Sequence, residues 1–120
     1  MTQTALSREQ VITMEVRPKL DALVAQHVMG WHKGDSWGGM YWEDSDKCCR
    51  YEILVFKPSL HTSMAWRVEE RIVELRLQAK YCVALKQVVI GTGEYVGMFD
   101  YIHATPAQRC KAALLAVLDI

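Results

Sequence analysis

The stretch ATPAQRCKAALLAVL, residues 104–118, carries both the start signal and the apolar face of a helix. Thr105 is a typical N-cap residue, and Pro106 suits the first helical position because its fixed φ matches that of a helix. Beyond Pro106, apolar side chains recur at the spacing of one helical face: Cys110, Ala113, Leu114, Val117 and Leu118. We therefore expect the chain to close with an amphipathic helix packed against a core.

Upstream, PKLDALVAQHVM, residues 18–29, predicts a second strong helix. Gly30 suits the position just after a helix end, where a positive φ is common. The predicted buried face includes His27, which we interpret as a hydrogen-bonded core histidine: Leu20, Leu23, Val24, His27 and Val28. Before it, Ser7 and Gln10 have capping-box spacing, which predicts a short first helix.

A third helix is predicted after Pro58, with Ser59 or Thr62 as its cap. Its inner stripe repeats at helical spacing: Ala65, Val68, Ile72 and Leu75. A run of charged residues on the other side predicts a solvated face with weak ion pairs along the helix: Arg67, Glu70, Arg71 and Glu74.

Strand signals lie between these helices. Residues 49–56 alternate in polarity, and residues 81–90 and 95–102 are rich in β-branched and aromatic side chains around a glycine-containing turn, which predicts an antiparallel hairpin. Residues 31–47 predict a loop or an irregular hairpin. We therefore expect an α+β fold, with a small antiparallel sheet of three to four strands layered with three main helices as an α/β/α sandwich.

Length and charge narrow the classes of function. The 120 residues match one domain, residues 1–120, and 14 basic side chains balance 14 acidic ones. Without a net positive charge, binding to duplex nucleic acid or to an anionic membrane is not expected. The chain begins without a secretory signal and lacks an apolar run long enough to span a bilayer, which predicts a cytoplasmic protein.

No motif in the sequence predicts catalysis or a cofactor. Gly91, Gly93 and Gly97 have the wrong spacing for a dinucleotide-binding loop and precede a strand-like segment. Cys48 and Cys49 are adjacent, a spacing unsuited to a metal-binding pair, so we expect no metal. Since the sequence also lacks the common hydrolase motifs, we expect a protein that is not an enzyme.

The segment MGWHKGDSWGGMYWED, residues 29–44, is the candidate binding region because it joins aromatic rings with glycines and charges. The rings predicted to stack on a planar ligand are Trp31, Trp37, Tyr41 and Trp42. The cations predicted to meet phosphate are Lys33, Arg50 and Lys57. Hydrogen bonds are expected from the start of the third helix: Ser59, His61 and Thr62. The alternative for Trp31 and Trp42 is that they pack into the core.

Three blocks together carry a family resemblance: LDALVAQHVMGW (20–31), PSLHTSMAWRVEE (58–70) and ATPAQRCKAALLAVL (104–118). In this order they resemble the phage ABA sandwich domain family of small bacteriophage and prophage proteins. The resemblance implies an α/β/α layered domain encoded by a phage and located in the host cytoplasm. It brings no set of catalytic residues.

With that setting, the aromatic and basic segment predicts a non-catalytic binding protein. One form is an anti-defence sponge that sequesters a nucleotide immune messenger, either a cyclic oligonucleotide or an ADP-ribose derivative, in a pocket that can lie between the subunits of a homo-oligomer. The alternative is an interaction module that binds a host or phage protein through an exposed aromatic loop. A hydrolase acting on the same messengers is a third reading, distinguished by turnover.

Overall fold

The computed structural model describes residues 6–34, 39–46, 48–90 and 97–120. The described elements follow one another in this order: α1 (Arg8–Ile12), α2 (Lys19–Leu23), the π-helical turn η1 (Val24–Val28), β1 (His32–Lys33), β2 (Tyr41–Glu43), β3 (Cys49–Glu52), α3 (Thr62–Glu74), α4 (Gln78–Ile90), α5 (Met98–Ile102) and α6 (Pro106–Leu118). The predicted α+β class with a small antiparallel sheet is confirmed. Among the described residues, no helix has both the length and the apolar character needed to cross a membrane.

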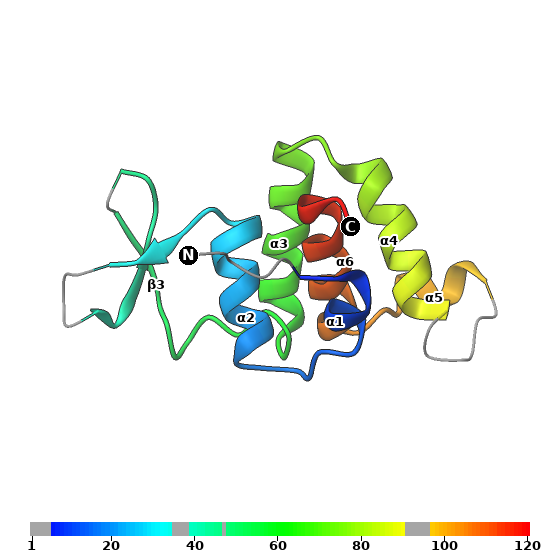
Figure 1. Cartoon of the computed structure of the whole chain (residues 1–120), viewed down its shortest axis with the longest axis horizontal. Helices are drawn as coiled ribbons and strands as arrows, with labels where there is room; N and C mark the ends of the chain where they lie inside the picture. Colours follow the sequence, from blue (N-terminus) through cyan, green and yellow to red (C-terminus); the bar gives the residue numbers. More distant parts are fainter. Residues whose placement is uncertain (1–5, 35–38, 47, 91–96) are drawn as a thin grey trace.

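Helix α6 lies at the centre of the helical part, in contact with α1, α2, η1, α3 and α4 (Figure 1). Thr105 caps its start as predicted, and Gln108 completes a capping box: the Gln108 N–H donates to Thr105 Oγ1 at 3.1 Å and the Thr105 N–H donates to Gln108 Oε1 at 2.8 Å. Residues 112–116 are buried without interruption. Because three of these five side chains are alanine methyl groups, neighbouring helices can approach α6 closely.

The predicted helix over residues 18–29 is divided into α2 and η1. In η1 the Met29 N–H donates to Val24 O at 3.0 Å, a bond that spans five residues rather than four. The wider turn rotates the following side chains about the helix axis. Ala25 and Val28 are buried and His27 is exposed, so the prediction of a core histidine at position 27 was wrong.

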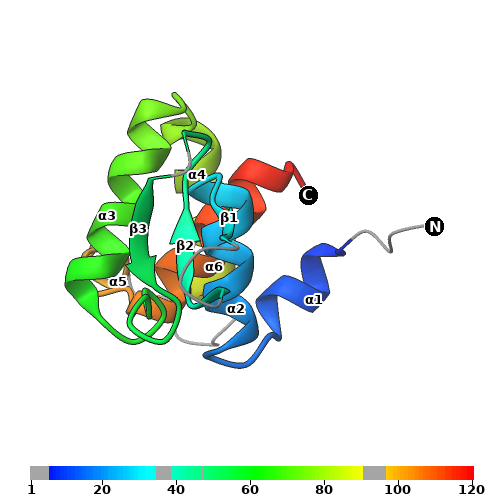
Figure 2. The same ribbon diagram turned by 90° about the vertical axis from the view of Figure 1, so that its left-hand side faces the viewer.

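The sheet has the strand order β1-β2-β3, with both pairs antiparallel. Figure 2 shows these strands forming a layer beside α2 and α3. Trp42 pairs with Lys33 on one side and with Tyr51 on the other, and its side chain is only 1% exposed. The irregular hairpin predicted for residues 31–47 is therefore confirmed where the chain is described.

The strand predicted over residues 49–56 ends earlier, at Glu52. The N–H groups of Val55 and Phe56 both donate to Glu52 O, at 2.9 and 3.1 Å, which closes a turn. This turn directs Phe56 into the core, where it is 2% exposed, and leaves Leu54 and Val55 on the surface. The alternation in polarity over residues 49–56 therefore predicts the strand only as far as Glu52, and the turn that follows allows the Phe56 ring to be buried.

The hairpin predicted from residues 81–90 and 95–102 is wrong. Residues 78–90 form α4 and residues 98–102 form α5, while residues 91–96 lie outside the described part. The buried side chains of α4 recur at helical spacing: Tyr81, Ala84, Leu85, Val88 and Val89. Val88 and Val89, which favoured a strand, are buried in this helix, whereas Val83 and Ile90 are exposed. Helix α4 contacts α6, and burial against a neighbour outweighs the small cost in helix propensity.

A polar network joins α3, α4 and α6 across their contact. Glu69 accepts hydrogen bonds from the Tyr81 hydroxyl and from Arg109 Nη1, the latter at 2.8 Å. Arg109 also donates to two backbone carbonyls, Ala104 O at 3.0 Å and Ile102 O at 2.9 Å. Burial raises the pKa of Tyr81, and the bond to Glu69 raises it further, so this hydroxyl stays protonated as a donor.

The central position of α6 predicts an unequal response along its own length. Leu114 has no exposed surface, so Leu114→Ala should leave a cavity and lower the free energy of unfolding by about 2–5 kcal/mol. Leu118 lies half-buried on the same helix, and Leu118→Ala should cost clearly less. Urea denaturation of both variants measures the difference, and equal losses would contradict the central role of α6.

Candidate ligand-binding cleft

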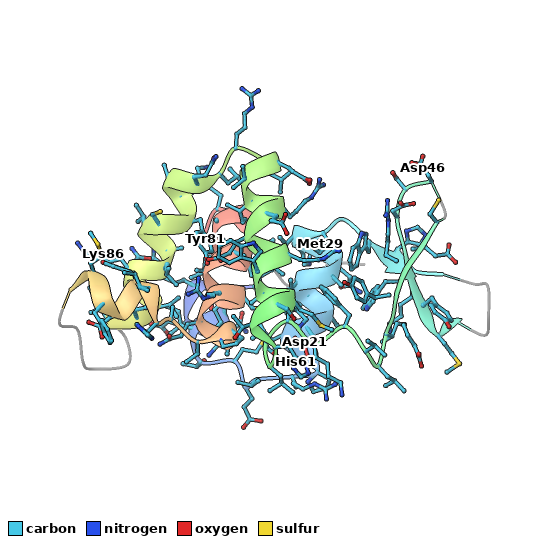
Figure 3. The ribbon with its side chains drawn as sticks, turned by 180° about the vertical axis from the view of Figure 1, so that it is seen from behind. Asp21, Met29, Asp46, His61, Tyr81 and Lys86 are labelled. Atoms are coloured by element: carbon cyan, nitrogen blue, oxygen red, sulfur yellow. The ribbon has the colours of Figure 1, made fainter. Side chains whose placement is uncertain are left out.

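A cleft of about 800 Å³ lies between α3 and the turn that joins β2 to β3. Figure 3 shows two of its lining residues, Met29 beside the helices and Asp46 at the tip of the turn. Its lining combines aromatic, basic and acidic side chains: Met29, Gly30, Trp31, Asp44, Ser45, Asp46, Arg50, Tyr51, Arg67, Arg71 and Glu74. Two other hollows, of about 300 and 470 Å³, border α4 and have mainly apolar walls. The first cleft therefore holds the densest set of groups able to recognise a polar ligand.

Aromatic rings form one part of the cleft. The Trp31 and Tyr51 rings lie 5.8 Å apart between centroids, and both contact the buried Phe56 ring, at 5.0 and 5.3 Å. Both rings are half-buried, so each is braced from behind while still lining the cleft. A braced ring loses little side-chain entropy when a planar group stacks on it.

The end of η1 sets the position of Trp31. Gly30 adopts a φ of +74°, a value that L side chains rarely adopt, and the chain reverses there. The Trp31 N–H then donates to Ala25 O at 2.9 Å, which ties the residue back to the π-helical turn. The ring is thus held by a backbone bond as well as by its contacts with Tyr51 and Phe56.

Helix α3 contributes the basic wall. Arg67, Arg71 and Glu74 are four and three residues apart, a spacing that brings them onto one helical face. Arg71 Nε donates to Val28 O at 3.2 Å, and Arg71 Nη1 pairs with Glu74 Oε1 at 3.1 Å. The predicted ion pairing along this helix is confirmed by Arg71 and Glu74, which are three residues apart. The predicted solvated position was wrong for Arg71, which is half-buried and donates to a carbonyl at the end of η1.

Asp44 organises the opposite wall. Its Oδ1 accepts the N–H groups of Asp46 and Cys48 at 2.9 and 3.0 Å, and its Oδ2 accepts Arg50 Nε and Nη2 at 2.8 and 2.7 Å. The Cys48 N–H is the largest cause that lowers the pKa of Asp44, with the Arg50 guanidinium adding to it. The carboxylate is therefore ionised at neutral pH and orients Arg50 along the cleft.

The predicted ring residues separate into different environments. Trp31 lines the cleft, whereas Trp42 is buried in the core and presents no free face, so its predicted stacking role is wrong. Tyr41 is half-buried on β2 and does not line the cleft. Trp37 lies outside the described residues.

Among the predicted cations, only Arg50 lines the cleft. Lys33 is exposed on β1, and Lys57 is half-buried in the segment before α3. Neither contributes to the walls of the cleft, so the three cations predicted to meet phosphate are not brought together there.

The predicted anion site at the start of α3 is not formed. Ser59 is buried, its N–H donates to Asp21 Oδ1 at 2.9 Å, and this carboxylate also pairs with Arg17 at 3.3 Å. The Ser59 N–H is therefore already bonded inside the protein. His61 is the N-cap residue in place of Ser59 or Thr62, and Figure 3 shows it far from Asp46 in the cleft.

Of the lining residues, only Trp31 and Arg50 were predicted as ligand contacts, and those missed include Asp46, Tyr51, Arg67 and Arg71. Tyr51 was assigned only to a strand, and the two arginines only to a solvated helical face. The spacing of Arg67 and Arg71 could have indicated that they share a face. The sequence contained no signal that this face of α3 meets the β2–β3 turn.

The chemistry of the cleft is that of recognition. Guanidinium groups bind phosphate or carboxylate through charge-assisted hydrogen bonds, and aromatic rings stack on planar groups. Within residues 6–34, 39–46, 48–90 and 97–120, no three His, Cys, Asp or Glu side chains gather in a way that could hold a metal ion.

The hydrogen bonds of Asp44 predict a measurable titration. The pKa of Asp44 should lie below the ordinary carboxyl value, so the stabilisation that these bonds provide is present above about pH 4 and is lost as pH falls through the lowered pKa. In Arg50→Gln the pKa should rise only part of the way back, because the Cys48 and Asp46 N–H groups still donate to this carboxylate. Carboxyl-carbon NMR titration measures this, with Arg67→Gln as a charge-matched control that should shift it less. An unshifted pKa in the unmodified protein would contradict the network.

Comparison with known proteins supports one assignment. The sequence model of the phage ABA sandwich domain family matches residues 22–114, a range that begins in α2, ends in α6 and includes every lining residue of the cleft. No curated protein and no solved structure gave a match. The chain therefore belongs to the phage ABA sandwich domain family.

Proposed function

We propose that this member of the phage ABA sandwich domain family is a non-catalytic binding protein that captures a nucleotide-like small molecule. The observation that carries the proposal is the cleft in which the Trp31 and Tyr51 rings line the same space as Arg67 and Arg71. A nucleotide joins a planar base to an anionic phosphate, and this cleft offers a partner for each.

The free energy of binding in such a complex would come from a few aromatic and guanidinium groups. A base stacked on an aromatic ring contributes about 1–3 kcal/mol, and a guanidinium hydrogen bond to phosphate contributes about 1.5–3 kcal/mol. Phe56 already braces both rings, and Val28 O already holds Arg71, so little ordering is left to the ligand. The volume of the cleft, about 800 Å³, lies within the range of small-molecule sites.

The family setting supports a role for such binding. A phage protein that holds a nucleotide without degrading it can lower the free concentration of an immune messenger in the host. In this proposal the protein is an anti-defence sponge, and its ligand is a cyclic oligonucleotide or an ADP-ribose derivative. A sponge returns its ligand chemically intact, whereas a hydrolase returns products.

Thermal melting with a panel of cyclic dinucleotides, cyclic trinucleotides and ADP-ribose cyclisation products tests the proposal. A ligand at 100 times its Kd should stabilise the protein by about 2.7 kcal/mol and raise the Tm. Arg67→Gln should weaken the effect about tenfold or more in Kd, because it removes a cation of the cleft. Lys33→Gln is the matched control, since Lys33 is exposed outside the cleft, and it should bind as the unmodified protein does.

Different results of these experiments contradict nucleotide binding, the choice of cleft or the sponge. No Tm shift with any member of the panel at high excess contradicts nucleotide binding. A shift that Lys33→Gln loses and Arg67→Gln keeps contradicts the choice of cleft. Chromatography of the released ligand then distinguishes a sponge from a hydrolase, because only the hydrolase yields products.

Protein binding is the alternative function, and α5 is the observation that favours it. Met98, Phe99 and Ile102 expose most of their apolar side chains within this one short helix, as anchors of protein interfaces do. This surface differs from the aromatic loop to which the sequence analysis assigned the contact, because Trp42 of that loop is buried.

A pull-down from infected cells tests the alternative. A stoichiometric polypeptide partner that Phe99→Ser releases and Arg67→Gln retains would favour protein binding through α5. Recovery of small molecules without such a polypeptide would contradict it.

A further inference from the structure

The three arginines of the cleft differ in what they already bind. Arg50 pairs with Asp44 at 2.7 Å, and Arg71 pairs with Glu74 at 3.1 Å while also donating to Val28 O. Arg67 is exposed, and its guanidinium has no ion pair or hydrogen bond with any residue in the described part of the chain. Arg67 is therefore the cation that a phosphate can reach without breaking an existing pair.

The carboxylates of the cleft also divide into those that are paired and one that is not. Asp44 is occupied by Arg50 and by two backbone N–H groups, and Glu74 is occupied by Arg71. Asp46 contributes only its backbone N–H to the turn, and its carboxylate is without a hydrogen bond or ion pair to the residues that the structure describes. An exposed acceptor thus stands on the turn wall, while Arg67 stands on the α3 wall.

This arrangement disfavours a polyanion. Among the residues that the structure describes, the lining of the cleft holds three arginines and three carboxylates, so this described lining has no net positive charge. A ligand with three or more phosphates would have to separate Arg50 from Asp44 or Arg71 from Glu74, or else leave phosphates beside Asp46. A phosphate and a carboxylate that line the same cleft repel each other, and breaking an ion pair leaves an uncompensated carboxylate facing the ligand.

A ribose with free hydroxyls has the complementary chemistry. Carboxylates bind sugar hydroxyls as hydrogen-bond acceptors, which is how an acidic residue reads the ribose in dinucleotide-binding sites. We infer, resting on the proposed function, that the ligand is a ribonucleotide with no more than two phosphates and a free cis-diol. Arg67 binds its phosphate and Asp46 accepts from its ribose hydroxyls, while a base or other planar group stacks on Trp31 and Tyr51.

Isothermal titration with four probes tests this assignment: AMP, ADP-ribose, AMP whose diol is blocked as the 2′,3′-isopropylidene ketal, and cyclic triadenylate. The two probes with free diols should bind at least about tenfold more tightly than the blocked probe and than cyclic triadenylate. Asp46→Asn should remove most of the difference between AMP and blocked AMP, because it removes the charged acceptor. Asp119→Asn, an exposed carboxylate at the end of α6 outside this cleft, should leave it unchanged.

The titrations can overturn the inference in three ways. Tighter binding of cyclic triadenylate than of AMP and ADP-ribose, weakened by Arg67→Gln, would overturn the inference and leave the proposed function standing. A diol preference that Asp46→Asn does not reduce would also overturn the assignment of Asp46. Absence of binding for all four probes would overturn the inference, and the wider panel of cyclic messengers would then decide the proposed function separately. Circular dichroism confirms that the surface variants are folded.

Discussion

The burial of α6 is the constraint on which the other helices depend. Residues 112–116 are covered on every side, and α1, α2, η1, α3 and α4 all contact this helix. A helix that is apolar around its circumference must be enclosed, and small side chains such as Ala112 and Ala113 set how closely its neighbours approach. The positions of α3 and α4 follow from this enclosure, and the polar bonds of Arg109 and Glu69 then lock α6 to α3.

The orientation of α3 about its own axis determines which of its side chains line the cleft. Ala65, Val68 and Ile72 face inward, so the face that carries Arg67 and Arg71 is directed toward the β2–β3 turn. The bond from Arg71 to Val28 O links this face to the end of η1, from which the chain continues to Trp31. The orientation of α3, which its buried side chains set, therefore brings together segments near residues 30, 45 and 70.

Preorganisation is the property that distinguishes this cleft from an ordinary surface depression. Its rings rest on Phe56, Arg71 is held by a backbone carbonyl, and Arg50 is held by Asp44. Groups already fixed in place lose less entropy on binding, so more of each contact contributes to affinity. The same ion pairs limit how much negative charge the cleft can accept, which connects its rigidity to its selectivity.

The features that the sequence by itself determined are local ones. The Thr105 cap, the inward stripe of α3 and the irregular hairpin near Trp31 depend on residues a few positions apart, so the local sequence predicts them. Residues 81–90 combine a helical spacing of apolar side chains with the strand preference of Val88 and its neighbours, and burial against α6 in the tertiary structure decided for the helix. Tertiary structure alone decided which tryptophan lines the cleft and which fills the core, and that Arg71 holds a distant carbonyl. These outcomes arise from contacts between residues far apart in the chain, whose free energies exceed local preferences.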